Sequence, residues 1–387
     1  GLCILMKITK NLSGLSKNEI RSTYFSNMKP ILNDRAMFAD ATEEYRSPEE
    51  PSAGDTVKLK FRTAKYNVDS VEVVVNGIAY SMKKFMTNTN FDYYIAEFTL
   101  GAQRTEYYFH ALVGRTSIYY NQAGPYRELN PTYNFVINPG FKTPDWAKGA
   151  VIYQIYVDRF RNGDKSNDVV DNEYVYIGEP VHSITDWNEY PATMDVRNFY
   201  GGDLQGVLDK MDYLESLGID AIYFNPLFVS PSNHKYDIQD YDYIDPHFGV
   251  IVNDGGEPLP DNARSNDNAT KYKKRVTDYA NLEASNEFFA KLVEEAHRRN
   301  IRVIIDGVFN HCGSFNKWLD RERIYEGSEG FDKGAYVDKE SPYHDFFKFQ
   351  DDYAWPYNQS YLGWWGHDTL PKLNYEDSKE LEEYVLG

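Results

Sequence analysis

The hydrophobic pattern of the chain changes near residue 138, and the two patterns require two different architectures. Between residues 57 and 137, short apolar–polar alternations are separated by turn residues such as Asn76-Gly77 and Gly101. An alternation of period two places one face of each strand in a core, which is typical of antiparallel sheets. The sequence therefore predicts an antiparallel β-sandwich over residues 28–138, and the Pro- and Gly-rich stretch "INPGFKTPDWAKG" (137–149) marks its boundary.

After this boundary, apolar runs typical of buried strands alternate with amphipathic helical segments. The strand-like runs cover residues 150–160, 219–228 and 301–305, and the helical segments cover residues 203–218 and 286–300. This alternation predicts βαβ units and a parallel sheet, whose strands should be buried on both faces. The connections after the first two strands, residues 161–202 and 229–285, are much longer than usual. Long loops at the carboxyl ends of parallel strands commonly carry function.

Composition limits the classes of partner. The chain has 59 acidic and 41 basic residues, a formal charge of −18, which argues against nucleic acid and anionic membranes and favours a neutral ligand. The absence of a clear signal peptide favours a cytoplasmic over a secreted location. Residues 1–27 match neither pattern and are interpreted as a leader or an artificial extension. The 33 tyrosines suit either core packing or stacking on sugars, and composition alone does not decide between them.

Polar residues follow two of the predicted strands at the point where each strand ends. The stretch "IRVIIDGVFNH" (301–311) ends in Asp306, Asn310 and His311, and the loop after the second strand contains His234 and Tyr236. Neutral His and Asp side chains can bond sugar hydroxyls, and an aromatic ring can cover the apolar face of a pyranose. Alternatively, Asp306 and His311 form a satisfied polar pair that closes a strand end, and Tyr236 packs in the core.

The loop "RNGDKSND" (161–168) gathers oxygen donors in a short span: Asn162, Asp164, Asn167 and Asp168. Several hard oxygen ligands on one loop suit Ca²⁺, which takes 6–8 such ligands, although the spacing differs from that of an EF-hand. The alternative is an ordinary turn rich in Asn and Asp.

Five motifs, in this order, resemble the α-amylase superfamily (glycoside hydrolase family 13), especially its neopullulanase, maltogenic amylase and amylopullulanase members. They are "VIYQIYVDRF", "YGGDLQGVLDKMDYLESLGIDAIYFNPLF", "SNHKYDIQDYDYIDPHFG", "DGVFNH" and "LPKLN". The resemblance implies a multidomain β plus α/β protein in which a starch-binding-type sandwich (28–138) precedes the first part of a (β/α)8 TIM barrel. The first three βα units would cover residues 139–311. The inserted domain B would cover 312–370, and the third barrel helix would start within 371–387.

The resemblance also implies an α-glucan-active glycoside hydrolase. Such an enzyme hydrolyses or transfers α-1,4 linkages, with α-1,6 linkages as a further option, by a retaining mechanism. The expected substrate is starch, maltodextrin, cyclodextrin or pullulan. By position in the motifs, His234, Tyr236 and His311 would contact the sugar, Asn310 would brace its loop or help a metal, and Asp306 would support the site.

Two further expectations follow from the same resemblance. A structural Ca²⁺ would be completed by the carbonyl of Gly201 and the carboxylate of Asp203. The family's nucleophile, acid/base and third Asp follow later barrel strands, and no matching motif occurs here, so this chain alone is expected to be inactive. The alternatives are a non-catalytic α-glucan-binding protein and an amylase-like ancillary subunit of a membrane transporter. A homodimer is a further expectation.

Overall fold

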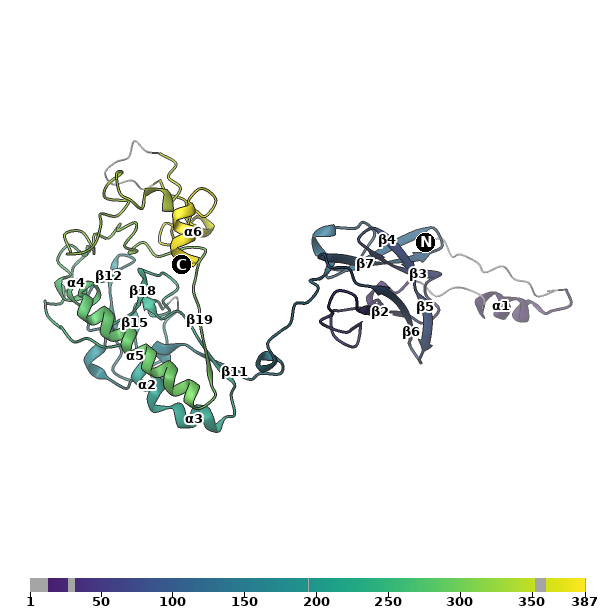
Figure 1. The fold of residues 1–387 in the computed structure, drawn as a ribbon, viewed down its shortest axis with the longest axis horizontal. Helices are drawn as coiled ribbons and strands as arrows, with labels where there is room; N and C mark the ends of the chain where they lie inside the picture. The colour runs from purple at the N-terminus through teal and green to yellow at the C-terminus, as the bar shows by residue number, and fades with distance from the viewer. Residues whose placement is uncertain (1–12, 27–31, 194, 352–359, 387) are drawn as a thin grey trace. The chain divides into compact units, whose positions relative to one another are not determined.

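The computed structural model describes residues 13–26, 32–193, 195–351 and 360–386. The chain divides into two compact units, residues 1–148 and 149–387, which are considered separately (Figure 1). The predicted start of the sandwich at residue 28, part of the predicted segment 1–27 and part of the predicted insertion 312–370 lie outside the described residues.

The first unit contains two antiparallel sheets. One has the order β1-β2-β6-β5; in the other the order is β4-β3-β7-β8-β9, and β10 also pairs with β7. The bounds of these strands are β1 Arg46–Ser47, β2 Thr56–Ala64, β3 Ser70–Val75, β4 Ile78–Ser81, β5 Lys83–Thr87, β6 Phe91–Thr99, β7 Thr105–Val113, β8 Thr116–Asn121, β9 Gly124–Tyr126 and β10 Phe135–Ile137. This arrangement confirms the predicted β-sandwich.

Alternating side chains of both sheets form one core. Phe61 of β2 stacks on Phe109 of β7 with ring centroids 4.7 Å apart and meets Tyr120 of β8 edge-on at 5.3 Å. Each adjacent tyrosine pair has one buried member, as the period of two requires. The buried members are Tyr94, Tyr107 and Tyr120, and their half-exposed neighbours are Tyr93, Tyr108 and Tyr119.

The N-terminal segment contains one helix that the sequence pattern did not predict, α1 (Lys17–Ser26). Its start has a reciprocal cap. The amide of Ser16 donates to Glu19 Oε2 at 2.8 Å, and the amide of Glu19 donates to Ser16 Oγ at 3.3 Å. This capping box satisfies two amides that have no partner within the helix.

The second unit is built on a parallel sheet with the order β11-β16-β19. The bounds are β11 Ile152–Ile155, β16 Ala221–Phe224 and β19 Arg302–Ile305. The parallel sheet is confirmed, but the expectation of strands buried on both faces is wrong for its two outer strands. Ile305 is 38% exposed and Ile152 is 52% exposed, because within the described residues β19 and β11 each pair with β16 alone.

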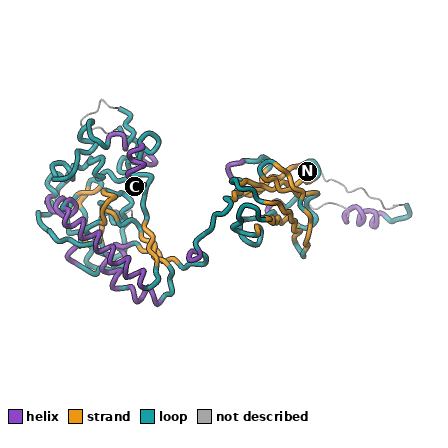
Figure 2. The backbone as a smooth tube through the Cα atoms, viewed as in Figure 1, coloured by secondary structure: helices purple, strands orange, loops and turns teal. Residues whose placement is uncertain are grey.

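Helices pack beside this sheet, and loops form much of the rest of the unit (Figures 1 and 2). The segment predicted as one helix over 203–218 is divided at Lys210 and ends at Ser216, and Leu217, which follows it, is exposed. Asp203 and Asp278 cap the starts of α2 and α5. The bounds are α2 Leu204–Asp209, α3 Met211–Ser216, α4 Thr270–Thr277, α5 Tyr279–Arg298 and α6 Lys379–Leu386.

The segment expected to form domain B shares a small core with residues outside it, and in this core Trp318 stacks on Tyr241 at 5.2 Å. Its two ends meet, since His311 and Lys372 form an antiparallel bridge. Short strand pairs also occur in the long segments after β11 and β16. They are β12 Val175–Tyr176 with β13 Glu179–Pro180, β14 His182–Ser183 with β15 Asn198–Phe199, and β17 Phe228–Val229 with β18 Asp240–Ile244. The described 3₁₀ turns are η1 Asp34–Ala36, η2 Pro131–Tyr133, η3 Asp145–Ala147, η4 Val157–Arg159, η5 Lys165–Asn167, η6 His344–Phe346 and η8 Trp364–Gly366.

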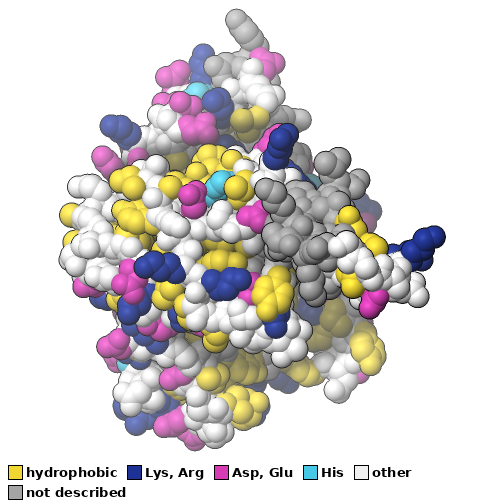
Figure 3. Space-filling model, turned by 90° about the vertical axis from the view of Figure 1, so that its right-hand side faces the viewer, with side chains coloured by type: hydrophobic (Ala, Val, Ile, Leu, Met, Phe, Trp, Pro, Cys, Tyr) yellow, Lys and Arg dark blue, Asp and Glu magenta, His cyan; other side chains and the backbone are white. Residues whose placement is uncertain are grey.

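On the face drawn in Figure 3, acidic and basic side chains are interspersed with exposed hydrophobic ones. Among the described residues, none of the helices combines the length and the apolar character that a membrane crossing requires.

The sandwich core gives a first testable prediction. Replacing Phe61 by Ala should destabilise this unit by about 3–5 kcal/mol, because the ring is fully buried and the surrounding strands cannot collapse onto the cavity. The matched control is Phe85→Ala, whose ring is 46% exposed and whose loss should change stability by less than about 0.5 kcal/mol. Urea unfolding followed by near-UV circular dichroism measures both, and equal effects would contradict the assigned core.

Candidate active site

Asp306 lies directly after β19 and is the acceptor shared by two tyrosines. Its Oδ2 accepts hydrogen bonds from the hydroxyls of Tyr223, at 2.9 Å, and Tyr236, at 3.0 Å. Its Oδ1 accepts from the amide of Val308 at 3.2 Å. Burial, and then the hydrogen bond to Asp306, raise the pKa of Tyr236 to about 12, so both phenols remain donors at neutral pH.

His311 is held through both ring nitrogens. Its Nε2 donates to the carbonyl of Tyr236 at 2.9 Å, and its Nδ1 bonds the side-chain amide of Asn310. Burial lowers the pKa of His311, so the ring is neutral, with the hydrogen on Nε2. Asn310 therefore braces the ring. The predicted bond from His311 to a sugar would require one of these two bonds to open.

The hydrogen bonds of the His234 side chain within the described residues involve one of its two ring nitrogens. Its Nδ1 accepts from the amide of Tyr236 at 3.0 Å, and burial lowers its pKa, so Nε2 carries the hydrogen. Its described hydrogen bonds use Nδ1, which leaves Nε2–H to donate to a ligand. The structure thus brings together all five predicted residues, which are called the strand-end cluster below: His234, Tyr236, Asp306, Asn310 and His311.

Two residues beside this cluster were missed by sequence reasoning. Tyr223 is a tyrosine inside the apolar strand "AIYF", one position before the strand end, and that placement was the available signal. Trp364 stacks on His311 with ring centroids 6.0 Å apart at 20°, and nothing in the local pattern indicated this contact.

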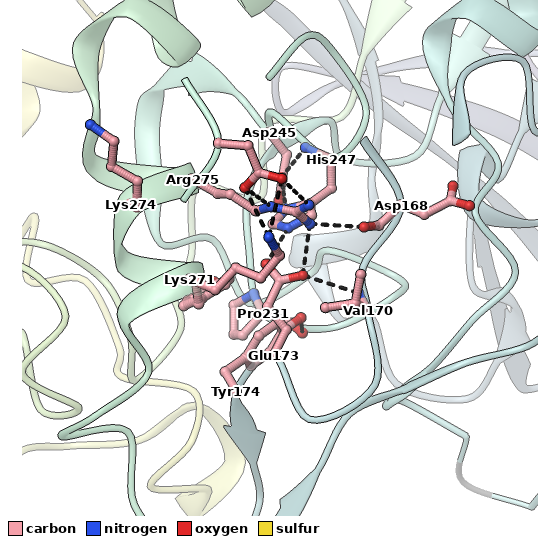
Figure 4. A network of polar contacts seen from close by, with 12 residues as sticks. Asp168, Val170, Glu173, Tyr174, Pro231, Asp245, His247, Lys271, Lys274 and Arg275 are labelled. Carbon is pink, nitrogen blue, oxygen red and sulfur yellow. Dashed lines mark hydrogen bonds and ion pairs between the residues drawn. The ribbon is translucent and has the colours of Figure 1, made fainter. Parts of the chain in front are cut away.

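A buried charge network, defined here as Lys235, Asp245, His247, Glu173 and Arg275, includes the residue between His234 and Tyr236 of the cluster. Figure 4 shows its members Asp245, His247, Glu173 and Arg275. Asp245 Oδ2 bonds Lys235 Nζ at 2.7 Å, and Asp245 Oδ1 bonds His247 Nδ1 at 2.8 Å. Glu173 Oε1 bonds His247 Nε2 at 2.7 Å, and Glu173 Oε2 accepts from Arg275 Nη1 at 2.8 Å. The network therefore joins the loop after β11, the loop after β16 and helix α4.

Opposite charges sustain one another in this network. Burial opposes the charged form of His247, but the charges of Glu173 and Asp245 raise its pKa overall. Burial likewise opposes ionisation of Asp245, yet Lys235 and His247 hold its pKa far below the usual range. Lys235 also has a left-handed backbone, φ +59°, between His234 and Tyr236. Its side chain is buried in the network while both neighbours remain partly exposed.

The loop 161–168 packs against the turn before α2. Asn162 Nδ2 donates to Asp168 Oδ1 at 2.7 Å, and a Cβ on Gly201 would lie 2.5 Å from Asn162 Nδ2, so the glycine backbone lies against both side chains. The Oδ1 atoms of Asn162 and Asn167 are buried without a hydrogen-bond partner. These orphaned oxygens fit the chemistry of a hard cation.

The acidic residues at this loop differ in burial and in their hydrogen-bond partners. Burial raises the pKa of Asp168 to about 6, and burial also raises the pKa of Asp203. Asp203 caps α2 by accepting from the amide of Gly206, and Asp164 Oδ1 accepts from Ser166. In the part of the chain that the structure describes, no group of three or more His, Cys, Asp or Glu side chains is arranged to hold a metal. Any cation here would depend on amide and carbonyl oxygens as well.

The sequence matches two family descriptions. Residues 154–267 and 264–385 match "Alpha amylase, catalytic domain", and residues 50–138 match "Alpha amylase, N-terminal ig-like domain". The chain belongs to the α-amylase family. The predicted resemblance is confirmed, and the three parallel strands are the first part of this family's catalytic domain.

The similar proteins are longer than this chain. An amylopullulanase of Thermoanaerobacter thermohydrosulfuricus is 32% identical over 84% of the chain and 22% of the relative. A cyclomaltodextrinase of Thermoanaerobacter pseudethanolicus is 34% identical over 84% of the chain and 46% of the relative. The solved structure of the type III pullulan hydrolase from Thermococcus kodakarensis matches with a TM-score of 0.51 and 28% identity, over 91% of the chain and 53% of that protein. The chain thus spans about half or less of these proteins.

The charge network gives a prediction about the loops. Lys235→Met should destabilise the second unit by about 3–5 kcal/mol, because it removes the cation bonded to Oδ2 of the buried Asp245 and leaves His247 as the remaining partner of that carboxylate. The control is Lys348→Met in the same unit, where the pair with Asp377 is 3.5 Å apart and more than half exposed, and an effect below about 1 kcal/mol is expected. Chemical denaturation of both variants measures the difference. A Lys235→Met protein as stable as the control would refute the role given to the network.

Proposed function

We propose that the protein represented by this chain is an α-glucan-active glycoside hydrolase that hydrolyses or transfers α-1,4 linkages, and α-1,6 linkages as a further option, by a retaining mechanism. The observation that carries the proposal is the strand-end cluster. Asp306, Tyr236 and His311 meet at the carboxyl ends of β16 and β19, in a chain that belongs to the α-amylase family. In barrel enzymes this is the end where chemistry occurs.

The chemistry of the cluster suits a sugar. The ring of Tyr236 is partly exposed and its hydroxyl is fixed by Asp306, so a ring face is available for the apolar face of a pyranose. His234 is neutral and can donate Nε2–H to a hydroxyl, while the neutral ring of His311 adds no charge beside an uncharged ligand. Asp306 acts as a positioning residue, since its oxygens accept from two phenols and an amide.

The names of relatives suggest the substrate class and location. Cyclomaltodextrinases, neopullulanases and amylopullulanases are among them, which supports starch, maltodextrin, cyclodextrin or pullulan as substrate. One relative is an intracellular maltogenic amylase of Bacillus subtilis, which supports a cytoplasmic location. A non-catalytic α-glucan-binding protein is the second candidate, because the cluster would serve binding equally well.

We also propose that the sandwich contacts α-glucan or a second copy of the chain. The support is a depression of about 550 Å³ lined by Tyr119, Tyr126 and Tyr133 together with Asn130. Tyr126 is 56% exposed and Tyr133 is 49% exposed, which leaves aromatic surface for a sugar or a protein partner.

The chain should bind α-glucan without turning it over. Titration calorimetry of the 387-residue protein with β-cyclodextrin is expected to show binding that Tyr236→Ala weakens about tenfold, through loss of the ring face. The control is Tyr213→Ala, a 48% exposed ring on α3. An assay on soluble starch should show no turnover, because no motif for the two catalytic carboxyl groups occurs in the sequence. Absence of binding would refute the glucan site. Turnover would refute the expectation that this sequence contains neither the nucleophile nor the acid/base carboxyl group.

Ca²⁺ is proposed as a structural ion at the loop 161–168. Asn162, Asn167 and Asp168 would supply side-chain oxygens, with the carbonyl of Gly201, the carboxylate of Asp203 and, with less support, Asp164. The ion would supply positive charge that offsets the burial of the Asp168 carboxylate. The orphaned oxygens of Asn162 and Asn167 support this proposal.

The raised pKa of Asp168 gives a pH-dependent test. The pKa of Asp168 is about 6 in the folded protein and about 3.9 in the unfolded chain, so the folded state binds the proton more tightly. The stabilisation from the protonated carboxyl is therefore complete below about pH 3.9 and is lost as the pH rises through about 6. Ca²⁺ binds the ionised carboxylate and should restore the lost stability. The rise in melting temperature with added CaCl₂ should therefore be larger at about pH 7, where Asp168 is ionised, than at about pH 5. Asp168→Asn should reduce the response, and Asp171→Asn, an exposed carboxylate of the following loop, should keep it. No response to chelation at either pH would refute the site.

A further inference from the structure

A row of three stacked rings leads from the strand-end cluster into the segment expected to form domain B. His311 and Trp364 stack with centroids 6.0 Å apart at 20°, and Trp364 and Trp365 stack at 5.5 Å and 27°. His311 is buried, Trp364 is half-buried, and Trp365 is 84% exposed. A tryptophan this exposed presents a large apolar face to water next to the residues proposed to hold a sugar.

The backbone fixes Trp365 in this exposed position. Its φ is +50°, in the left-handed region that bulky side chains disfavour. Two turn bonds close the segment on either side of it, since Gly366 N donates to Gly363 O at 3.0 Å and His367 N donates to Trp364 O at 3.0 Å. Gly363 is required there, because a Cβ would lie 2.0 Å from His367 O.

The surrounding structure anchors this turn at both ends. Gly363 pairs with Pro371, and Trp364 N donates to Leu370 O at 2.8 Å. On the far side, Arg321 Nη1 bonds Asp368 Oδ2 at 2.9 Å, and the hydroxyl of Tyr361 donates to Asp368 O at 2.6 Å. An exposed aromatic face that is held by this many bonds is preorganised, so binding a ligand there would cost little further ordering.

We infer that Trp365 is a sugar-stacking platform that determines specificity for longer α-glucans. This inference rests on the proposed glucan site, and it assigns Trp365 to a glucose unit beyond the one that contacts Tyr236. A glucose unit bound at Tyr236 would lie near His311, and two successive ring contacts, of 6.0 Å and 5.5 Å between centroids, lead from His311 to Trp365. Only an oligosaccharide can therefore contact both, which favours maltoheptaose over maltose.

The test compares two ligands and three variants of the 387-residue chain by titration calorimetry. Trp365→Asn removes the ring while keeping a residue that tolerates the left-handed backbone, and Trp365→Phe restores an aromatic face. Trp187→Asn is the control, a 43% exposed tryptophan that meets Tyr200 edge-on in the loop after β11. Melting curves confirm that each variant is folded.

Trp365→Asn is expected to weaken maltoheptaose binding about tenfold and to leave maltose binding unchanged, while Trp365→Phe keeps most of the affinity. Equal affinity of Trp365→Asn and the unmodified chain for maltoheptaose would overturn the platform and leave the glucan site intact. An equal loss for both ligands would also overturn it, because the effect would then be structural. Failure of the unmodified chain to bind either ligand would overturn the glucan site and the platform together.

Discussion

The ion pair between Lys235 and Asp245 is the contact on which the loops of the second unit depend. Within the described residues, the segments after β11 and β16 contain short strand pairs of two to five residues, so no long strand ladder holds them. Buried charged groups add to these short strand pairs. Asp245 is shared by Lys235 and His247, and Glu173 links His247 to Arg275. Such burial is unfavourable unless every charge is paired with good geometry. Removal of one member leaves its partner buried and uncompensated, and this makes the loop arrangement cooperative.

The same network connects the two proposed sites. Lys235 stands between His234 and Tyr236, and its buried amine fixes the turn that presents both side chains. At the other end, Arg275 Nη1 donates to the carbonyl of Asp168 at 2.8 Å, within the loop proposed to hold Ca²⁺. The proposed cation site and the proposed glucan site are therefore supported by one set of charges. Glu173 and Arg275 thus connect the loop 161–168 to His247 and, through Asp245 and Lys235, to the loop that carries His234 and Tyr236.

Local periodicity predicted the parts of the structure that neighbours in sequence determine. Alternation predicted the sandwich, and the strand–helix pattern predicted the parallel sheet and placed Tyr236, Asp306 and His311 after the ends of its strands. Contacts between residues far apart in sequence left no such signal. Glu173 and Arg275 are 102 positions apart, and Tyr223 and Asp306 are 83 apart. The exposure of Ile305 was also mispredicted. An apolar strand predicts burial of its side chains on both faces, but its sequence does not show whether a neighbouring strand is present on each side.

The hydrogen bonds within the strand-end cluster determine how it can recognise a sugar. Asp306 accepts both phenol hydroxyls, and both nitrogens of His311 are engaged by Asn310 and the carbonyl of Tyr236. The polar atoms that a sugar would be expected to use are thus already satisfied within the protein. Among the described residues of the cluster, the Nε2–H of His234 is bonded to no other group, and the ring of Tyr236 is partly exposed. Recognition by this half of a site would therefore depend on shape and ring stacking, with one directional donor. The hydrogen bonds that distinguish one linkage from another would have to come from other residues around the sugar.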